Sequence, residues 1–290
     1  MDPADLCIPA HCGDSGAELA FQAFHAVRSM KITCLMENTA ASPEFAAEHG
    51  LSLHIEAAGR RLLFDMGQSS AFAANAARLG IDLATVDAAV LSHGHYDHGG
   101  GMARFLEIND HALVYHSSLA FGGHWHGEKY IGLDQALNGH PRLHPVEGNL
   151  FLGGGLALHS GGGMPCRHPI DSAGLTLVKA GVHVPETFDH EQYLVMEEHG
   201  RRVVISGCSH RGVANIAAWL KPDVLVGGFH LMKKTLPEDA PQLDALAAEL
   251  LDSGAVFYTG HCTGDAAYAY LKERMGNRLH YLRAGEWVEL

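Results

Sequence analysis

One run of six residues constrains this chain more than any other: His93-Gly94-His95-Tyr96-Asp97-His98, which holds three imidazoles and a carboxylate. The apolar residues 88–91 before it predict a buried strand, and the three glycines at 99–101 after it let the chain turn sharply. We therefore predict that these side chains lie on a loop at a strand's end. Zinc, iron and manganese all bind imidazole and carboxylate, so the run predicts a metal site. The alternative, a solvated histidine-rich loop, has no need of four ligand-type side chains after an apolar strand.

The spacing within the run predicts two metal positions. His93 and His95 point to the same side of an extended segment, so both can reach one ion. Asp97 and His98 fall beyond the turn, toward a second ion. We therefore expect two divalent ions, most simply zinc, with manganese or iron as alternatives.

This motif, preceded by Leu63-Phe64-Asp65-Met66-Gly67, resembles the metallo-β-lactamase-fold hydrolase superfamily. The later segments Ser-Gly-Cys-Ser-His at 206–210, Gly-Gly-Phe-His-Leu at 227–231 and Gly-His-Cys-Thr-Gly at 260–264 resemble one branch of it. That branch is named for dihydropterin-ribofuranosyl-aminobenzene phosphate synthase. The resemblance implies an α/β (α+β) chain folded as an αββα four-layer sandwich around a metal centre. Because members hydrolyse very different molecules, the branch name is a weak guide to the substrate.

The resemblance also implies the ligand sets. The first ion would be held by His93, His95 and His210, and the second by Asp97, His98 and His261. His210 and His261 each follow a predicted strand, as His93 does, although a histidine there can also have a purely structural role, such as capping a helix. Many superfamily members have a bridging aspartate where this chain has Gly207-Cys208-Ser209. Cys208 can ligate as a thiolate, but a small buried side chain that packs the turn is the favoured interpretation, and the second position is then the weaker one.

Three further residues are assigned roles around the ions. His230 follows a predicted strand and two glycines, and we expect a general acid or oxyanion-stabilising group rather than a further ligand, because each ion already has three. Asp65 is expected to accept a hydrogen bond from a ligand histidine or from the loop's backbone, with an ordinary buried turn aspartate as the alternative. His116, after another predicted strand, is expected to line the substrate pocket. The remaining histidines are assigned no role.

Composition narrows the class of protein. The 290 residues are 47% hydrophobic and 18% charged, which suits one large core. Twenty basic residues against 33 acidic ones give a net charge of -13, which argues against nucleic acid as a partner. The six cysteines show no regular spacing and predict no disulfide framework. No apolar run is long enough for a membrane span and no signal peptide is recognisable, so a cytoplasmic protein without a membrane partner is expected.

Residues 30–290 are expected to form one domain of two similar halves, preceded by an N-terminal extension at residues 1–29 whose status stays open. A short amphipathic helix at 17–28 would pack on the domain or mediate homodimer contacts. In the first half we expect strands at 31–36, 51–57, 61–65, 88–91 and 112–115 and helices at 70–79 and 100–107. In the second half we expect strands at 175–179, 192–197, 202–206, 223–226 and 255–259 and helices at 212–220 and 241–253. The irregular stretch 117–174 is expected to carry substrate loops.

The predicted function is metal-dependent hydrolysis. Two ions would present a shared water as hydroxide and polarise the carbonyl or phosphoryl oxygen, with Asp97 orienting the nucleophile and His230 assisting the oxyanion or leaving group. Backbone N–H groups left open at Gly99–Gly101 would favour a small anionic substrate, phosphorylated or carboxylated. The alternatives are the dihydropterin-linked synthase, a di-iron redox protein, a nuclease or phosphodiesterase, and a pseudoenzyme that binds a small-molecule signal.

Overall fold

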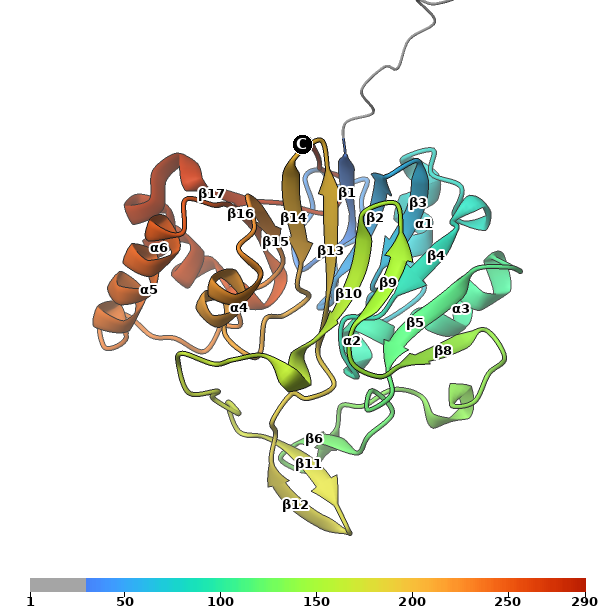
Figure 1. Cartoon of the computed structure of the whole chain (residues 1–290), viewed down its shortest axis with the longest axis horizontal. Coiled ribbons are helices and arrows are strands. Elements are labelled where there is room, and N and C mark those ends of the chain that lie inside the picture. The colour runs from blue at the N-terminus through green and yellow to red at the C-terminus, as the bar shows by residue number, and fades with distance from the viewer. Residues whose placement is uncertain (1–29) are drawn as a thin grey trace, which may run out of the picture.

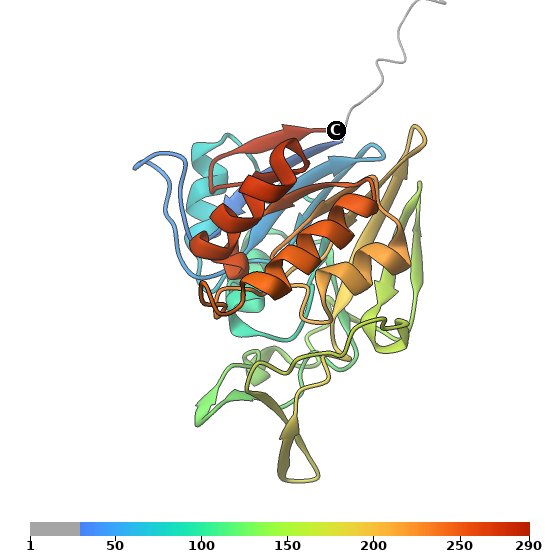
Figure 2. The same ribbon diagram turned by 90° about the vertical axis from the view of Figure 1, so that its left-hand side faces the viewer.

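Two seven-stranded sheets lie face to face, with helices on both outer sides, in the computed structural model, which describes residues 30–290 (Figures 1 and 2). Helices α1 (Ala71–Arg78) and α3 (Met102–Ile108) belong to the first half. Helices α4 (Val213–Leu220), α5 (Ala240–Asp252) and α6 (Asp265–Met275) cover the second sheet. This αββα arrangement confirms the predicted fold class. The extension at residues 1–29 and its predicted helix lie outside the described residues.

The first sheet has the order β18-β1-β2-β3-β4-β5-β8. Its strands are β1 (Lys31–Met36), β2 (Ser52–Ala57), β3 (Arg60–Phe64), β4 (Ala88–Val90), β5 (Leu113–Ser117), β8 (Leu143–Val146) and β18 (Trp287–Glu289). The strands from β3 to β8 run parallel, whereas β18, β1 and β2 pair in antiparallel fashion. The carboxyl ends of β3, β4 and β5 therefore meet at one edge.

The second sheet has the order β17-β16-β15-β14-β13-β10-β9. Its strands are β9 (Leu150–Gly153), β10 (Leu156–Ser160), β13 (Gln192–Glu198), β14 (Arg201–Ile205), β15 (Val224–Val226), β16 (Val256–Thr259) and β17 (Leu279–Tyr281). The strands from β14 to β17 run parallel, so this sheet also gathers carboxyl ends at one edge. The two halves are therefore built alike, as the sequence predicted.

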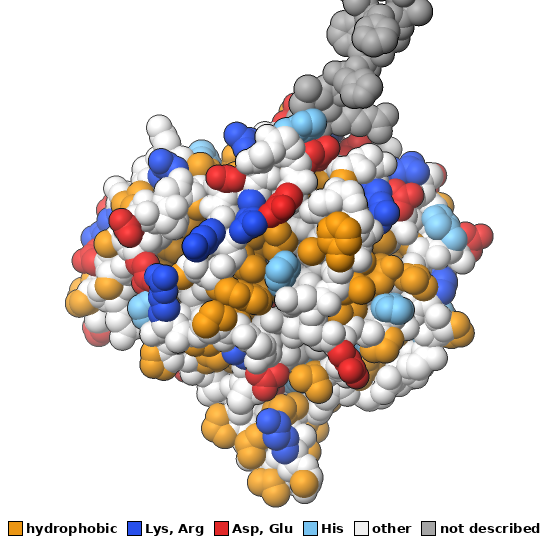
Figure 3. All heavy atoms as spheres, viewed as in Figure 1, with side chains coloured by type: hydrophobic (Ala, Val, Ile, Leu, Met, Phe, Trp, Pro, Cys, Tyr) orange, Lys and Arg blue, Asp and Glu red, His pale blue; other side chains and the backbone are white. Residues whose placement is uncertain are grey.

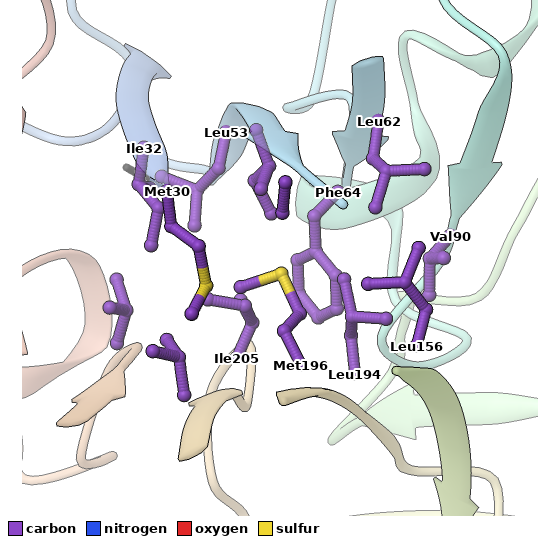
Figure 4. Close-up of a cluster of buried hydrophobic side chains, with 14 of the residues drawn as sticks. Met30, Ile32, Leu53, Leu62, Phe64, Val90, Leu156, Leu194, Met196 and Ile205 are labelled. Atoms are coloured by element: carbon purple, nitrogen blue, oxygen red, sulfur yellow. The ribbon is translucent and has the colours of Figure 1, made fainter. Parts of the chain in front are cut away.

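Between the sheets lies a core of apolar side chains from both halves (Figure 4). Phe64 of β3 is fully buried and points across the gap toward Leu194 and Met196 of β13. Two further clusters fill the space beneath the helices, one around Phe72 and Phe105 and the other around Ile216 and Leu271. Burial on both faces explains why the central strands are runs of apolar residues.

The middle of the chain differs from the expectation. Residues 117–174 contain five short strands rather than loops alone, and β8, β9 and β10 extend the two main sheets. Strand β11 (Leu175–Lys179), predicted to open the second half, instead pairs with β6 (His124–His126) and β12 (Val182–Pro185). With β7 (Lys129–Tyr130) these make a separate four-stranded sheet, of which β6, β11 and β12 project below the sandwich in Figure 1. Within residues 30–290, no helix is both long and apolar enough to cross a bilayer.

Candidate metal centre

Most of the predicted site residues follow the parallel strands of the two sheets. In the first sheet, Asp65 follows β3, the His93–His98 run follows β4, and His116 lies in β5. In the second sheet, His210 follows β14, His230 follows β15 and His261 follows β16. Because these strand ends lie at the same edge of the sandwich, residues more than 100 positions apart in the sequence meet there.

The first predicted ligand set comes together. His93, His95 and His210 have ligand atoms within 4.8 Å of one another, and all three side chains are buried. The Nε2 atoms of His93 and His210 face each other at 3.3 Å. A tetrahedral zinc ion with Zn–N bonds of about 2.05 Å sets its ligand nitrogens about 3.3 Å apart. Burial and the neighbouring histidines hold the pKa of His93 and of His210 well below the usual range, which keeps both rings neutral as ligands must be.

The second predicted ligand set also comes together, and Cys208 joins it. Asp97, His98, Cys208 and His261 are buried, with ligand atoms within 4.8 Å of one another. The Cys208 sulfur lies 3.1 Å from Nε2 of His98, and an oxygen of Asp97 lies 3.3 Å from Nε2 of His261. The sequence favoured a packing role for Cys208, but its sulfur points into the cluster. Both candidate positions can therefore be occupied by a divalent ion held by three or four side chains of this chain.

Asp65 holds the loop and one ligand in place. Its Oδ1 accepts a hydrogen bond from the Ser92 backbone N–H at 2.7 Å. Its Oδ2 accepts one from Nδ1 of His98 at 2.6 Å and another from the Ser92 hydroxyl at 2.7 Å. These are the contacts expected for it. Burial alone would lower the pKa of His98, but the charges of the Asp65 and Asp97 carboxylates and the hydrogen bond that His98 donates to Asp65 raise it to about 9. With Nδ1 bonded to the carboxylate, Nε2 is the nitrogen that faces the cluster.

Asp97 is the acidic group at the centre of the site. Burial alone would raise the pKa of its carboxyl, but the charge on His98 and the hydrogen bonds from His261 and His49 hold it well below the usual range. His49 reaches Asp97 with its Nε2 at 3.3 Å and is 39% exposed. The carboxylate is therefore ionised and available as a ligand at neutral pH.

Sequence reasoning missed the residues that position His261. Its backbone N–H donates to Glu37 at 2.9 Å, and its Nδ1 lies 2.8 Å from the side-chain oxygen of Asn38. Both residues come directly after β1, so the strand-end rule that found His93 could have found them. His49 lies in a loop without such a signal, and only the tertiary structure brings it to Asp97.

His230 stands against the first cluster, with its ring centroid 4.2 Å from that of His210. Burial alone would lower its pKa, but a hydrogen bond to Cys262 and the charges of Cys262 and Glu191 raise it. His230 and His210 both line a cavity of about 620 Å³, together with Phe229, Lys233 and residues of α4 and α5. A protonated His230 at the wall of this cavity can donate a proton to a bound molecule.

His116 lies elsewhere. It is buried, its Nδ1 donates to the Ser117 carbonyl at 2.8 Å, and it lines a second cavity of about 560 Å³ with Phe121 and Lys179. The cavity at His210 and His230 has a different lining. The structure therefore places His116 at the wall of a cavity but does not bring it to the two predicted ligand sets, and its role as a substrate contact stays a prediction.

The glycines at 99–101 have a different role from the one predicted. Their backbone is helical, with φ of -64° at Gly100 and -81° at Gly101, so no sharp turn requires them. A Cβ atom at Gly101 would overlap the Met66 carbonyl, and one at Gly100 would overlap the Gln68 carbonyl. Their N–H groups donate to His95, Tyr96 and Gly67 carbonyls. The expectation of open N–H groups for an anionic substrate is therefore wrong.

Two histidines that the sequence left without a role are buried near His95. His124 and His190 belong to a further cluster of ligand-type side chains with Glu186. They lie in or near a stretch without strong periodicity, and only the small sheet and the loop before β13 bring them together.

The fold and the paired histidine and carboxylate clusters define a class of metal-binding αββα proteins. The chain matches the family model described as metallo-beta-lactamase superfamily over residues 47–261, and it belongs to this superfamily. An uncharacterized protein of Methanocaldococcus jannaschii is 30% identical over 212 residues, which are 69% of this chain and 79% of the relative. The superfamily resemblance predicted from the sequence is thus confirmed.

Two further comparisons bear on the branch. The 7,8-dihydropterin-6-methyl-4-(beta-D-ribofuranosyl)-aminobenzene-5'-phosphate synthase of Methanocaldococcus jannaschii is 26% identical over 290 residues, covering 91% of this chain and 97% of the relative. The crystal structure of Tm1679, described as a metal-dependent hydrolase of the beta-lactamase superfamily, is 28% identical and superposes with a TM-score of 0.76, covering 90% of this chain and 99% of that one. The sequence also predicted this synthase as a relative.

Proposed function

We propose that this protein is a metal-dependent hydrolase of a small, anionic substrate. The observation that carries the proposal is the meeting of two buried ligand clusters, one from His93, His95 and His210 and the other around Asp97, beside an open cavity. Bound divalent ions supply an activated water and polarise the bond under attack. Zinc suits the histidine-rich ligand sets, with manganese or iron as alternatives.

Several residues of this chain have separate roles in the proposed reaction. Asp97 would bind the second ion and orient the nucleophilic water, while Asp65 fixes the ring nitrogen that His98 would offer. His230 donates its proton to the leaving group or stabilises the oxyanion from the wall of the 620 Å³ cavity. Lys233 lines the same cavity and supplies a positive charge toward an anionic group.

The partner is a small molecule rather than nucleic acid. The net charge is -13, and basic and acidic side chains are interspersed on the face shown in Figure 3. Because a nucleic-acid surface needs a continuous basic patch, these charges do not favour a nuclease. The homodimer and the cytoplasmic location stay predictions.

A synthase is the second candidate, because a relative with 26% identity over most of both chains carries that name. Phosphate or pyrophosphate would leave in such a reaction, which the same cluster and His230 can support. A di-iron redox protein is the third candidate, because the same ligands suit iron. Elemental analysis and visible absorption of the purified protein separate iron from zinc.

The test combines metal analysis with a screen of phosphodiester, lactone and thioester substrates. We expect about two zinc or manganese ions in the two clusters, and hydrolysis of at least one substrate class. The double variant His93→Ala/His95→Ala should lose the first ion and the activity. The variant His230→Ala should keep its metal and lose about 100-fold or more in kcat, the usual size of a general acid's contribution.

The exposed His111 offers a matched control, since His111→Ala should change neither metal content nor kcat. Unchanged metal content in the double variant would contradict the assignment of His93 and His95 as metal ligands. Loss of metal in His230→Ala would make His230 a ligand rather than an acid. Iron with no hydrolysis of any substrate would move the assignment to redox chemistry.

A further inference from the structure

Four buried side chains form another ligand-type cluster next to the candidate centre: His95, His124, Glu186 and His190. Their ligand atoms lie within 4.8 Å of one another, and each residue is 4% exposed or less. Only His95 has a part in the proposed function. The cluster thus places three side chains with metal-binding chemistry outside that function.

Three ring nitrogens in this cluster lack partners. Nε2 of His95, of His124 and of His190 is buried without a hydrogen-bond partner among the described residues. Buried polar atoms are nearly always paired, because an unpaired one forfeits its hydration without compensation. Three unpaired nitrogens in one cluster therefore point to a bound ion or a bound water.

His124 is already arranged as a metal ligand. Its Nδ1 donates to Oε2 of Glu186 at 2.7 Å, and Oε1 of Glu186 accepts the backbone N–H groups of Thr187 and Phe188 at 3.0 and 3.1 Å. The carboxylate thus fixes the tautomer in which Nε2 of His124 carries a free lone pair. A carboxylate behind a histidine in this way is the usual support of a metal-bound ring.

Charge favours an ion over a water. The ion pairs that Glu186 makes within residues 30–290 are with His124 and His190 alone, and the carboxylate is 3% exposed. A buried carboxylate needs a compensating positive charge, which a water does not provide. A divalent cation accepts the lone pair on Nε2 of His124 and balances the charge of the carboxylate at once.

We propose that His95, His124 and His190 bind a third metal ion, a divalent ion of zinc type, with Glu186 holding the His124 ring from behind, at a position separate from the two clusters described above. The position shares only His95 with the first cluster, and because a neutral imidazole has a lone pair on one nitrogen only, His95 serves both ions only as an imidazolate that has given up its second ring proton. His124, Glu186 and His190 line the 560 Å³ cavity that also contains His116. The ion therefore has an entry path of its own, away from His230.

His190 is the weakest of the three ligands. Its Nδ1 accepts the Gly94 backbone N–H at 2.9 Å, so the proton of the neutral ring lies on Nε2, 3.8 Å from Glu186. To bind as a neutral ligand, the ring has to move that proton to Nδ1 and give up the Gly94 hydrogen bond. Loss of His190 should therefore weaken the third position less than loss of His124.

The experiment counts zinc in the full-length protein after removal of all metal, reloading with excess zinc and gel filtration. We expect wild type to retain one zinc per chain more than His124→Ala, and His190→Ala to fall between them. His126→Ala is the matched control, because His126 lies two residues further along β6 and is exposed. It should retain the wild-type amount. Anomalous diffraction at the zinc edge should show a peak among the four side chains.

Glu186→Gln is the second variant, in case His124→Ala does not fold, because it keeps the side-chain size and removes the charge. Equal zinc content in wild type and in the folded variants would overturn the third position, as would a water among the four side chains in zinc-loaded crystals. Zinc at the His93 and Asp97 clusters, with none here, would overturn this inference and leave the proposed hydrolase intact.

Discussion

The buried pair of Asp65 and His98 links the stability of the metal-free protein to pH. The folded chain holds a proton on His98 up to a pH of about 9, whereas the unfolded chain releases it near the ordinary histidine pKa of 6.5. This pair therefore stabilises the folded state fully below pH 6.5, and the stabilisation is lost as the pH rises through about 9. His93 and His210 contribute little over most of this window, because they are neutral in the folded chain and lose their protons in the unfolded chain as the pH rises above 6.5.

Asp65→Asn tests this linkage. Without the carboxylate the pKa of His98 should fall toward its ordinary value, so the free energy of unfolding of the metal-free variant should depend less on pH. Between pH 6.5 and 9 the free energy of unfolding of the wild type should fall by up to about 3 kcal/mol more than that of the variant, at about 1.4 kcal/mol per pKa unit. Urea unfolding of chelator-treated protein measures it.

The exposed pair of Asp110 and His111 offers a control for that experiment. The Asp110 side chain is 98% exposed and lies 3.2 Å from the His111 ring, so solvent screens the interaction. Asp110→Asn should keep the wild-type dependence of stability on pH. The same dependence in Asp65→Asn as in wild type would contradict the account given for His98.

At this level the sequence pointed to the candidate ligands that follow predicted strands and missed the candidates that tertiary structure brings together. His93, His95, Asp97 and His98 are adjacent in the chain, so their proximity needed no fold. Cys208 was interpreted as packing, because only its contact with His98 shows which way the sulfur points. The cluster with His124 depends on a small sheet that the sequence did not predict.

The segment from His93 to Gly101, which contains the short helix α2 (Tyr96–Gly99), is held by close packing. Helix α3 begins just after Gly101, and a Cβ atom there would overlap the carbonyl oxygens of Met66 and Ser69 and the Phe72 ring. The backbone angle itself, with φ of -81°, suits any residue. Lack of space, rather than conformation, therefore requires glycine at this position.

Gly101→Ala should for this reason destabilise the protein, although glycine to alanine in helical backbone is usually neutral or stabilising. Overpacking against fixed carbonyls costs about 1–3 kcal/mol and should also weaken zinc binding, since Asp65 directly precedes Met66. Gly163→Ala is the control, because its Cβ would have no neighbour within 4 Å. Chemical denaturation and zinc titration measure both effects, and equal behaviour of the two variants would refute the packing argument.

Helices α1, α3, α4 and α5 and the longer strands could be predicted, because these helices are periodic over seven or more residues and these strands consist largely of apolar residues. Strands β8, β9 and β17 have three or four residues each, too short for a two-residue period to be recognised. Apolar and polar residues alternate at the start of strand β11, and this pattern is found in any sheet with one buried face. The sequence therefore did not show whether β11 belongs to the small sheet or to the sandwich. Helix α6 lacks a clear apolar stripe, and only Ala267, Leu271 and Met275 are buried.

Packing of the two sheets against each other is what assembles the candidate centre. One half supplies His93 to His98, and the other supplies Cys208, His210 and His261, so neither half holds a complete ligand set. The apolar core between the sheets fixes the distance between these two groups. Core and metal site are therefore energetically coupled, and bound metal should stabilise the folded chain.

Phe64→Ala tests how much the inter-sheet core contributes. Phe64 is fully buried between the sheets and directly precedes Asp65, so its removal leaves a cavity at the base of the site (Figure 4). We expect a loss of about 3–5 kcal/mol in the free energy of unfolding of the metal-free protein, the usual cost of such a truncation. Phe151→Ala in β9 is the control, because Phe151 is 73% exposed and should cost less than about 0.5 kcal/mol. Urea unfolding distinguishes them, and a similar small loss in both would mean that the sheets are held together mainly by other contacts than this core.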